Sequence, residues 1–205
     1  MKIVAFGDSI TEGAAGGITP EQNWLYLLGK KLGSGFELIN AGVGGNSARE
    51  AMARYEKDVL AHDPNVILLE FGGNNHDPRP GRSHRRVSDD EFSLLLEKFK
   101  AGLPAKCQVV VITFPPIIDE QHLFGPLVPG GKVDDELQSQ RQIVRDFARK
   151  NGYPLLDLYK EIYPRRYELI FPDGVHLNVA GQIFFAEKAA EILKNSGIIS
   201  SVSPL

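Results

Sequence analysis

The chain has 205 residues, a length that suits one domain with a sizeable hydrophobic core. Hydrophobic residues make up 42% and charged residues 24%, and the formal net charge of -3 gives no global attraction to nucleic acid or anionic membranes. The single cysteine, Cys107, excludes an internal disulfide, and we expect a buried, inert thiol. No apolar stretch is long enough for a signal peptide or a bilayer span. A cytoplasmic location is therefore the default expectation, although a mature secreted form would look similar.

Apolar, β-branched runs alternate along the chain with amphipathic segments. The runs cover residues 2–6, 36–40, 65–71, 107–113 and 154–158. They lack clean polar alternation, which is typical of strands buried on both faces of a parallel sheet. The order predicts an α/β protein, built as one three-layer α/β/α sandwich with right-handed crossovers.

The segments between these runs carry helix-start and helix-stop signals. Capping patterns stand at residues 19–22 (TPEQ), 47–50 (SARE) and 88–91 (SDDE). The third is followed by one apolar helix face, made of Phe92, Leu95, Leu96 and Phe99. A further helix near 134–150 stops at Asn151-Gly152. The last helix, about 178–195, is predicted to bury Val179, Ile183, Ala186, Ala190 and Leu193.

No repeat, low-complexity tract or linker divides the chain, so we predict a single domain over residues 1–199 with a loose tail at 200–205. Two stretches, about 72–87 and 114–133, are too long to be simple connections. Long loops in compact domains are usually functional or mobile. The charged residues of the first loop, which include His76, His84 and Arg86, are expected to be solvated.

Chemically useful residues follow three successive strands. Ser9 follows the first, the glycine-rich turn 42–46 (GVGGN) the second, and residues 72–75 (GGNN) the third. Ligands of open parallel sheets bind beyond the carboxyl ends of the strands, so these residues are expected to converge on one edge. The ordinary alternative is a turn or helix-cap serine and glycines that adopt positive φ.

Near the C-terminus the block DGVHLN at residues 173–178 offers a base and its orienting group. Asp173 and His176 are three residues apart, and Gly174 between them favours a tight turn that sets the carboxylate beside the imidazole. A serine needs such a base, held by a third group, to become a nucleophile. The alternative is a surface loop in which Asn178 caps the last helix.

Several other site classes are disfavoured. The serine does not stand in a Gly-x-Ser-x-Gly elbow, which argues against an α/β-hydrolase fold. Neither a dinucleotide fingerprint nor a P-loop follows the first strand. No histidine, cysteine or carboxylate cluster has metal-ligand spacing, so we do not expect a structural zinc site. A serine activated by a histidine also needs no metal and no organic cofactor.

These blocks resemble those of the SGNH (GDSL-type) hydrolases, and the resemblance runs nearly end to end. It covers residues 6–13 (FGDSITEG), 40–47 (NAGVGGNS), 72–75 (GGNN) and 173–178 (DGVHLN). It implies a five-stranded parallel sheet in the flavodoxin-like order 2-1-3-4-5. It also implies a triad of Ser9, Asp173 and His176, and an oxyanion hole made of the Ser9 amide, Gly45 and Asn74.

Two positions depart from the family pattern. Asn46 and Asn75 each stand where an aspartate is common, and both are expected to support loops rather than to react. The resemblance implies a serine esterase that cleaves small acyl esters through an acyl-enzyme. A carbohydrate O-acetylesterase is the runner-up, a lysophospholipase or thioesterase is a further alternative, and a non-catalytic binding module is the distant one. The oligomeric state is left open. Apolar residues at 115–118 and 123–128 either wall the site or pack on the core.

Overall fold

The computed structural model describes residues 1–76, 86–123 and 132–199. The strands are β1 (Lys2–Gly7), β2 (Glu37–Gly42), β3 (Val66–Glu70), β4 (Gln108–Ile112) and β5 (Leu155–Leu156). The helices are α1 (Ser9–Glu12), α2 (Trp24–Leu32), α3 (Ala48–Asp58), α4 (Asp89–Ala101), α5 (Val133–Glu136), α6 (Gln138–Asn151), α7 (Leu158–Ile162), α8 (Arg166–Leu169) and α9 (Val179–Asn195). The predicted tail at 200–205 lies outside the described residues.

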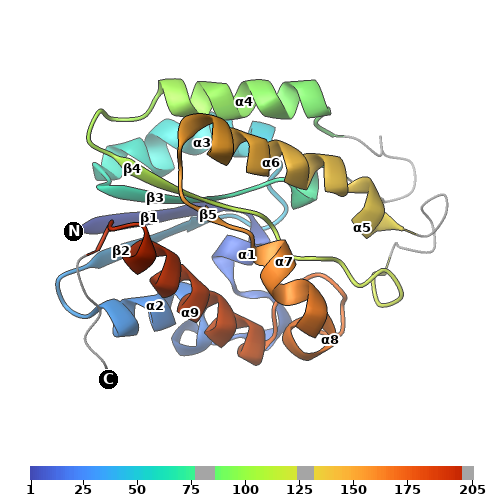
Figure 1. Cartoon of the computed structure of the whole chain (residues 1–205). Coiled ribbons are helices and arrows are strands. Elements are labelled where there is room, and N and C mark those ends of the chain that lie inside the picture. The colour runs from blue at the N-terminus through green and yellow to red at the C-terminus, as the bar shows by residue number, and fades with distance from the viewer. Residues whose placement is uncertain (77–85, 124–131, 200–205) are drawn as a thin grey trace.

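The five strands form one parallel sheet in the order β2-β1-β3-β4-β5. Helices α3, α4 and α6 cover one face, and α2 and α9 cover the other (Figure 1). The predicted three-layer sandwich and the strand order implied by the resemblance are both confirmed.

Alternation along the strands divides the core between the two layers. In β1, Ile3 and Ala5 pack on the α2–α9 side, whereas Val4 and Phe6 pack on the α3–α4–α6 side. Successive side chains of a strand point to opposite faces, so a strand covered on both faces is apolar throughout. This explains why the runs lack polar alternation.

Most helix boundaries agree with the capping signals. Ser47 and Glu50 form the predicted capping box of α3, and the hydroxyl of Ser88 accepts the Glu91 N–H at 3.2 Å at the start of α4. Gly152 ends α6 in the left-handed conformation. The first signal does not start a long helix, because TPEQ caps only a 3-10 turn at Pro20–Gln22 and α2 begins after Asn23, whose side chain caps it.

The predicted face of α9 is only partly correct, because Ala186, Ala190 and Leu193 are buried but Val179 and Ile183 are not. Val179 and Ile183 are 41% and 44% exposed, whereas Gln182 and Phe185 are buried. The Phe185 ring stacks on Trp24 of α2 with centroids 4.0 Å apart. Apolar residues stand on more than one face of α9, so the packing partner selects the buried one.

Candidate active site

The candidate nucleophile lies in a tight turn at the carboxyl end of β1. Ser9 is the first residue of α1, and the Asp8 side chain caps this helix by accepting the Ile10 N–H at 3.0 Å. A Cβ on Gly7 would lie 2.8 Å from the Glu70 carbonyl oxygen and would overlap the Thr11 side chain. Only glycine therefore lets the chain leave β1 this close to β3.

Ser9, His176 and Asp173 are in direct contact. The Ser9 Oγ lies 3.0 Å from His176 Nε2, and His176 Nδ1 lies 2.7 Å from Asp173 Oδ2. Burial alone would raise the pKa of Asp173, but hydrogen bonds from His176 and from the backbone N–H groups of His176 and Val175 outweigh burial and lower it. The carboxylate is therefore charged and fixes the proton of the neutral imidazole on Nδ1, which leaves Nε2 to accept from the serine.

A hydrogen-bonded turn sets this geometry. Asp173 Oδ1 accepts the backbone N–H groups of Val175 and His176, at 2.9 and 3.0 Å. Gly174 has a φ of 75°, and a Cβ there would lie 2.6 Å from the Ile118 carbonyl oxygen. The predicted tight turn is therefore present, and Asn178 caps α9 directly after it.

The glycine turn after β2 and the 3-10 turn after β3 approach Ser9 from the neighbouring strand ends. Gly45 has a φ of 75°, and it lines the same cavity as Ser9 and Asn74. The Asn74 amide nitrogen donates to Asp8 Oδ2 at 3.0 Å. This bond leaves the second amide hydrogen available to another acceptor in the cavity.

Asn46 and Asn75 hold loops, in agreement with the sequence-based expectation. Asn46 Oδ1 accepts Nε of Arg54 at 2.7 Å. Asn75 is buried, accepts the Ala48 N–H at 2.9 Å and donates to Gln140 at 2.8 Å. Asn75 therefore ties the turn after β3 to the starts of α3 and α6.

The expectation of a solvated charged loop is wrong for its described members. Arg86 donates to the carbonyl oxygens of Gly45 and Asn74, at 3.0 and 3.3 Å, and binds both carboxylate oxygens of Glu50 at 2.7 Å. His76 is buried, with its Nε2 2.5 Å from a Glu136 carboxylate oxygen. Arg86 thus bridges the two turns that carry the candidate oxyanion donors. His84 lies outside the described residues.

The serine opens onto a cavity of about 600 Å³. Its apolar lining includes Phe114, Pro115, Ile117 and Val133. The apolar residues at 115–118 are therefore divided, because Ile118 packs in the core whereas Pro115 and Ile117 face the cavity. Residues 124–128 of the second expected apolar stretch lie outside the described residues.

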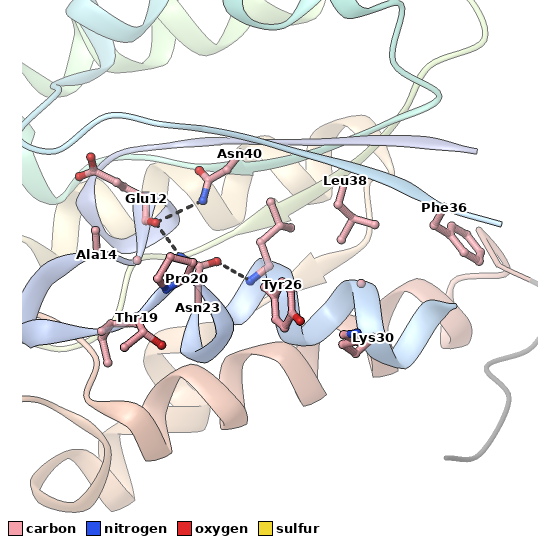
Figure 2. Close-up of a pocket in the computed structure, with 14 residues that line it drawn as sticks. Glu12, Ala14, Thr19, Pro20, Asn23, Tyr26, Lys30, Phe36, Leu38 and Asn40 are labelled. Carbon is pink, nitrogen blue, oxygen red and sulfur yellow. Dashed lines mark hydrogen bonds between the residues drawn. The ribbon is translucent and has the colours of Figure 1, made fainter. Parts of the chain in front are cut away.

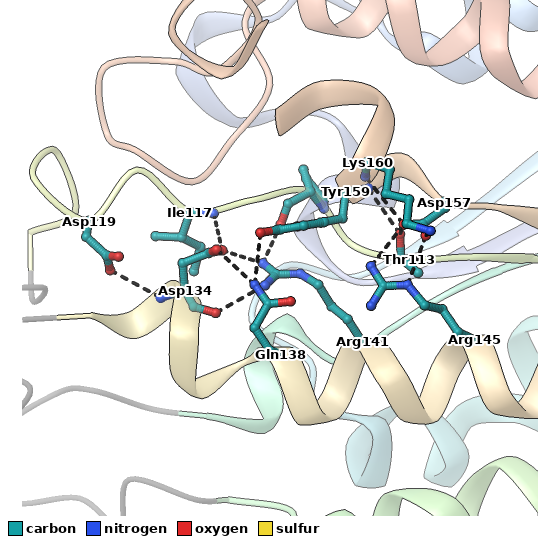
Figure 3. Close-up of polar contacts among 11 residues, drawn as sticks. Thr113, Ile117, Asp119, Asp134, Gln138, Arg141, Arg145, Asp157, Tyr159 and Lys160 are labelled. Atoms are coloured by element: carbon teal, nitrogen blue, oxygen red, sulfur yellow. Dashed lines mark hydrogen bonds and ion pairs between the residues drawn. The ribbon is translucent and has the colours of Figure 1, made fainter. Parts of the chain in front are cut away.

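A buried arginine holds the wall of this cavity (Figure 3). Arg141 of α6 is 0% exposed, pairs with Asp134 at 2.6 Å and donates to the Pro115 carbonyl oxygen at 2.9 Å. Its guanidinium also lies over the rings of Phe114 and Tyr159, 4.4 and 4.3 Å from their centroids. One cation therefore fixes α5, α7 and the segment after β4 relative to one another.

A second cavity, of about 640 Å³, lies between α2 and β2 and does not include the candidate nucleophile (Figure 2). The two cavities are similar in size, and the contacts among Ser9, His176 and Asp173 locate the chemistry in the other one. At its rim the amides of Asn23 and Asn40 both donate to the Glu12 carbonyl oxygen, at 2.7 and 3.2 Å. These bonds hold the end of α1 against the start of α2 and against β2.

Two buried carboxyl groups beside Ser9 were not singled out by sequence reasoning. Asp8 is 1% exposed and Glu70, the last residue of β3, is 0% exposed. Burial raises the pKa of Asp8 to about 6 and that of Glu70 well above its ordinary value. The available signal was Glu70 itself, an acid inside the apolar run 65–71.

Other site classes find no support in the described residues. Across residues 1–76, 86–123 and 132–199, no group of three or more histidine, cysteine or carboxylate side chains could hold a metal ion. Over the same ranges, no helix has the length and apolarity needed to cross a bilayer. Cys107 is half-buried rather than fully buried, and burial raises the pKa of its thiol to about 11, which disfavours the reactive thiolate.

Comparison with known proteins identifies the family of the chain. Residues 5–182 match the GDSL-like Lipase/Acylhydrolase family. The chain is 24% identical to the Escherichia coli protein named thioesterase 1/protease 1/lysophospholipase L1, over 94% of this chain and 83% of that one. It is also 24% identical to an acetylxylan esterase of Geobacillus stearothermophilus, over 74% of this chain and 69% of that one.

Among solved structures, a lipase/acylhydrolase from Enterococcus faecalis superposes with a TM-score of 0.77 at 22% identity, covering 100% of this chain and 98% of that one. The family match spans most of the chain and includes the serine block. The chain therefore belongs to the GDSL-like lipase/acylhydrolase family and is a hydrolase that acts on ester bonds.

Proposed function

We propose that the protein hydrolyses small acyl esters through a covalent acyl-enzyme on Ser9. The observation that carries this proposal is the continuous hydrogen-bonded chain from Ser9 Oγ through His176 to Asp173. It lies beside an asparagine amide in a cavity large enough for a small ester. A serine that only started a helix would need neither a base nor an orienting carboxylate.

In the acylation half-reaction, His176 Nε2 removes the Ser9 proton while the serine oxygen attacks the ester carbonyl. The carbonyl π electrons move onto oxygen, and N–H groups of Ser9, Gly45 and Asn74 bind the resulting oxyanion. When the tetrahedral intermediate collapses, the imidazolium gives its proton to the leaving alcohol. Asp173 stabilises the imidazolium between the removal of the Ser9 proton and its delivery to the alcohol.

In the deacylation half-reaction, a water molecule takes the place of the alcohol. His176 removes a proton from the water, the hydroxide attacks the acyl carbon, and the same donors bind the second oxyanion. Its collapse returns the proton to Ser9 and releases a carboxylic acid. The described residues supply every proton transfer in this cycle.

Deacetylation of a carbohydrate is the second candidate. It is supported by the relationship to an acetylxylan esterase and by polar side chains at the cavity, among them Arg86, His122 and His76. Hydroxyl-rich leaving groups need such partners, whereas the apolar lining of Phe114 and Ile117 suits an alkyl chain. A panel of p-nitrophenyl esters with graded acyl length, acetylated xylo-oligosaccharides and an acyl thioester would rank these substrates by kcat/KM.

The nucleophile is tested by labelling with a fluorophosphonate, which reacts with activated serines. The wild type is expected to be labelled and to turn over p-nitrophenyl acetate, whereas Ser9→Ala should lose both and keep its thermal transition. The matched control is Ser88→Ala, which removes an exposed capping serine of α4 and should retain both labelling and turnover. Labelling that persists in Ser9→Ala would overturn the proposal.

A further inference from the structure

The residue before the nucleophile connects the two parts of the candidate site. Asp8 Oδ1 accepts the Ile10 N–H at 3.0 Å and so caps the helix that begins at Ser9. Its Oδ2 accepts the Asn74 amide at 3.0 Å. One buried carboxyl group therefore touches both the nucleophile turn and the candidate oxyanion asparagine.

Glu70 lies directly behind Asp8. Glu70 pairs with Gly7 in the register of β3 and β1, and its Oε2 accepts the Thr11 hydroxyl at 3.0 Å. Among the described residues, no hydrogen-bond donor reaches its Oε1, which is also buried. The Glu70 side chain lies close enough to Asp8 for each carboxyl group to shift the pKa of the other, and a hydrogen bond between them is the contact that their positions allow. Two carboxyl oxygens can share such a bond only when one of them carries a proton.

The surrounding charges decide which carboxyl is ionised. The Arg54 guanidinium acts on Asp8 from α3, where it donates to the Gly7 carbonyl oxygen at 2.9 Å, and His176 lowers the pKa of Asp8 when its imidazole is protonated. Asp8 accepts the N–H groups of Ile10 and Asn74, whereas Glu70 accepts the Thr11 hydroxyl and also interacts with the Asp8 backbone N–H. Two adjacent buried carboxylates repel each other strongly, so one proton is retained. These contacts favour the charge on Asp8 and the proton on Glu70.

We propose that neutral Glu70 donates a hydrogen bond to the Asp8 carboxylate, and that Asp8 thereby orients the Asn74 amide toward the reacting carbonyl oxygen. Both acids are positioning residues, and this role rests on the proposed function. An ionised Asp8 can only accept hydrogen bonds, so it holds the N–H side of the Asn74 amide, and the amide cannot turn its oxygen toward Asp8. A proton on Asp8 Oδ2 would face the amide nitrogen, and rotation of the amide would then direct its oxygen at the oxyanion.

The test compares Glu70→Gln with Glu70→Met in the full chain. Glutamine has the shape of the protonated acid, with an oxygen for Thr11 and an N–H for Asp8, whereas methionine has the length but no donor. Glu70→Gln should keep kcat within about twofold of the wild type. Glu70→Met should lower kcat roughly 10–100-fold with KM nearly unchanged, because misplaced catalytic groups cost rates of this order.

The pH profile of kcat/KM supplies a readout that a merely structural role would not move. Wild type and Glu70→Gln should share one acid limb, because Asp8 must lose its proton before it can hold the N–H side of the Asn74 amide. In Glu70→Met this limb should move up by about one pH unit, since a hydrogen bond to the charged form has been removed. A limb that moves down in Glu70→Gln would mean that Glu70 is ionised, which would overturn the proposal.

Two measurements keep the proposal separate from the nucleophile assignment. The infrared difference spectrum of wild type minus Glu70→Gln at pH 7 should contain the C=O stretch of a protonated carboxylic acid, and its absence would refute the shared proton. If Glu70→Met folds and matches the wild type in kcat and acid limb, the positioning role is wrong. Loss of the proposed function is recognised independently, because wild-type protein would then fail to react with the fluorophosphonate.

Discussion

Replacing Glu70 by glutamine should stabilise the fold at neutral pH. In the unfolded chain this carboxyl ionises with its ordinary pKa of 4.5, whereas burial and the neighbouring Asp8 carboxylate raise the pKa well above that value in the folded state. An acid with a raised folded-state pKa contributes its full stability below the unfolded value. That stability is lost as the pH rises toward the folded value.

The magnitude follows from the proton that Glu70 must retain. In the unfolded chain the carboxyl has a pKa of 4.5, about 2.5 units below pH 7. Because each unit corresponds to about 1.36 kcal/mol, retaining the proton in the folded state lowers the unfolding free energy by about 3 kcal/mol. Glutamine keeps the shape and the donor without this cost. The gain in Glu70→Gln should therefore be near zero below pH 4.5 and grow with pH to about 3 kcal/mol at pH 7.

The assay is urea unfolding of both proteins at several values between pH 4.5 and 8. At pH 7 the gain should also raise Tm by about 6–12 °C, from the usual relation for domains of this size. The matched control is Glu37→Gln on the exposed edge strand β2, which removes the same charge and should change stability by less than about 0.5 kcal/mol. A difference between wild type and Glu70→Gln that is independent of pH would refute the retained proton.

Three further predictions concern the site and its support. Asn74→Ala should lower kcat roughly 10²–10³-fold, and Asn74→Asp should be at least as damaging because it places an acceptor against the developing oxyanion; normal turnover by either folded variant in a p-nitrophenyl acetate assay would remove Asn74 from the oxyanion hole. Gly174→Ala should lower kcat/KM by about tenfold or more. Its φ is 75° and an added Cβ would lie 2.6 Å from the Ile118 carbonyl oxygen, so the turn that carries Asp173 and His176 must shift. Gly152→Ala, also at positive φ but remote from the site, should leave kcat/KM unchanged. Arg141→Met should lower the unfolding free energy by about 3–5 kcal/mol in urea titrations, because Asp134 is left without its buried partner, and Arg141→Met combined with Asp134→Asn should recover part of that loss.

Local sequence determined the helices and strands, and the turn that brings Asp173 to His176. Strands covered on both faces are mostly apolar, so the five runs could be identified from residue type, although Glu70 lies buried at the end of β3. Capping side chains act within four residues of their helix, which is why Ser47 and Ser88 marked their helices correctly. The contact between Asp173 and His176 is likewise set by a turn of four residues, with Gly174 at the position that needs a positive φ.

Tertiary structure decided the features that depend on residues distant in the chain. Arg86 and His76 looked like solvated loop charges, but Arg86 meets Glu50 of α3 and His76 meets Glu136 of α5. The buried face of α9 was settled by Trp24, more than 150 residues away in the sequence. An α-helix that is apolar on more than one side has no unique inward face until its partner is present.

The pairing of Asp8 with Glu70 shows most clearly what tertiary structure decided. Sequence shows an acid before the candidate nucleophile and another inside an apolar strand, but not that parallel pairing of β1 with β3 sets Gly7 opposite Glu70. That register alone brings the two carboxyl groups together away from water. The residue types are local properties of the chain, whereas their ionisation depends on the low dielectric and the neighbouring charge that only the assembled sheet supplies.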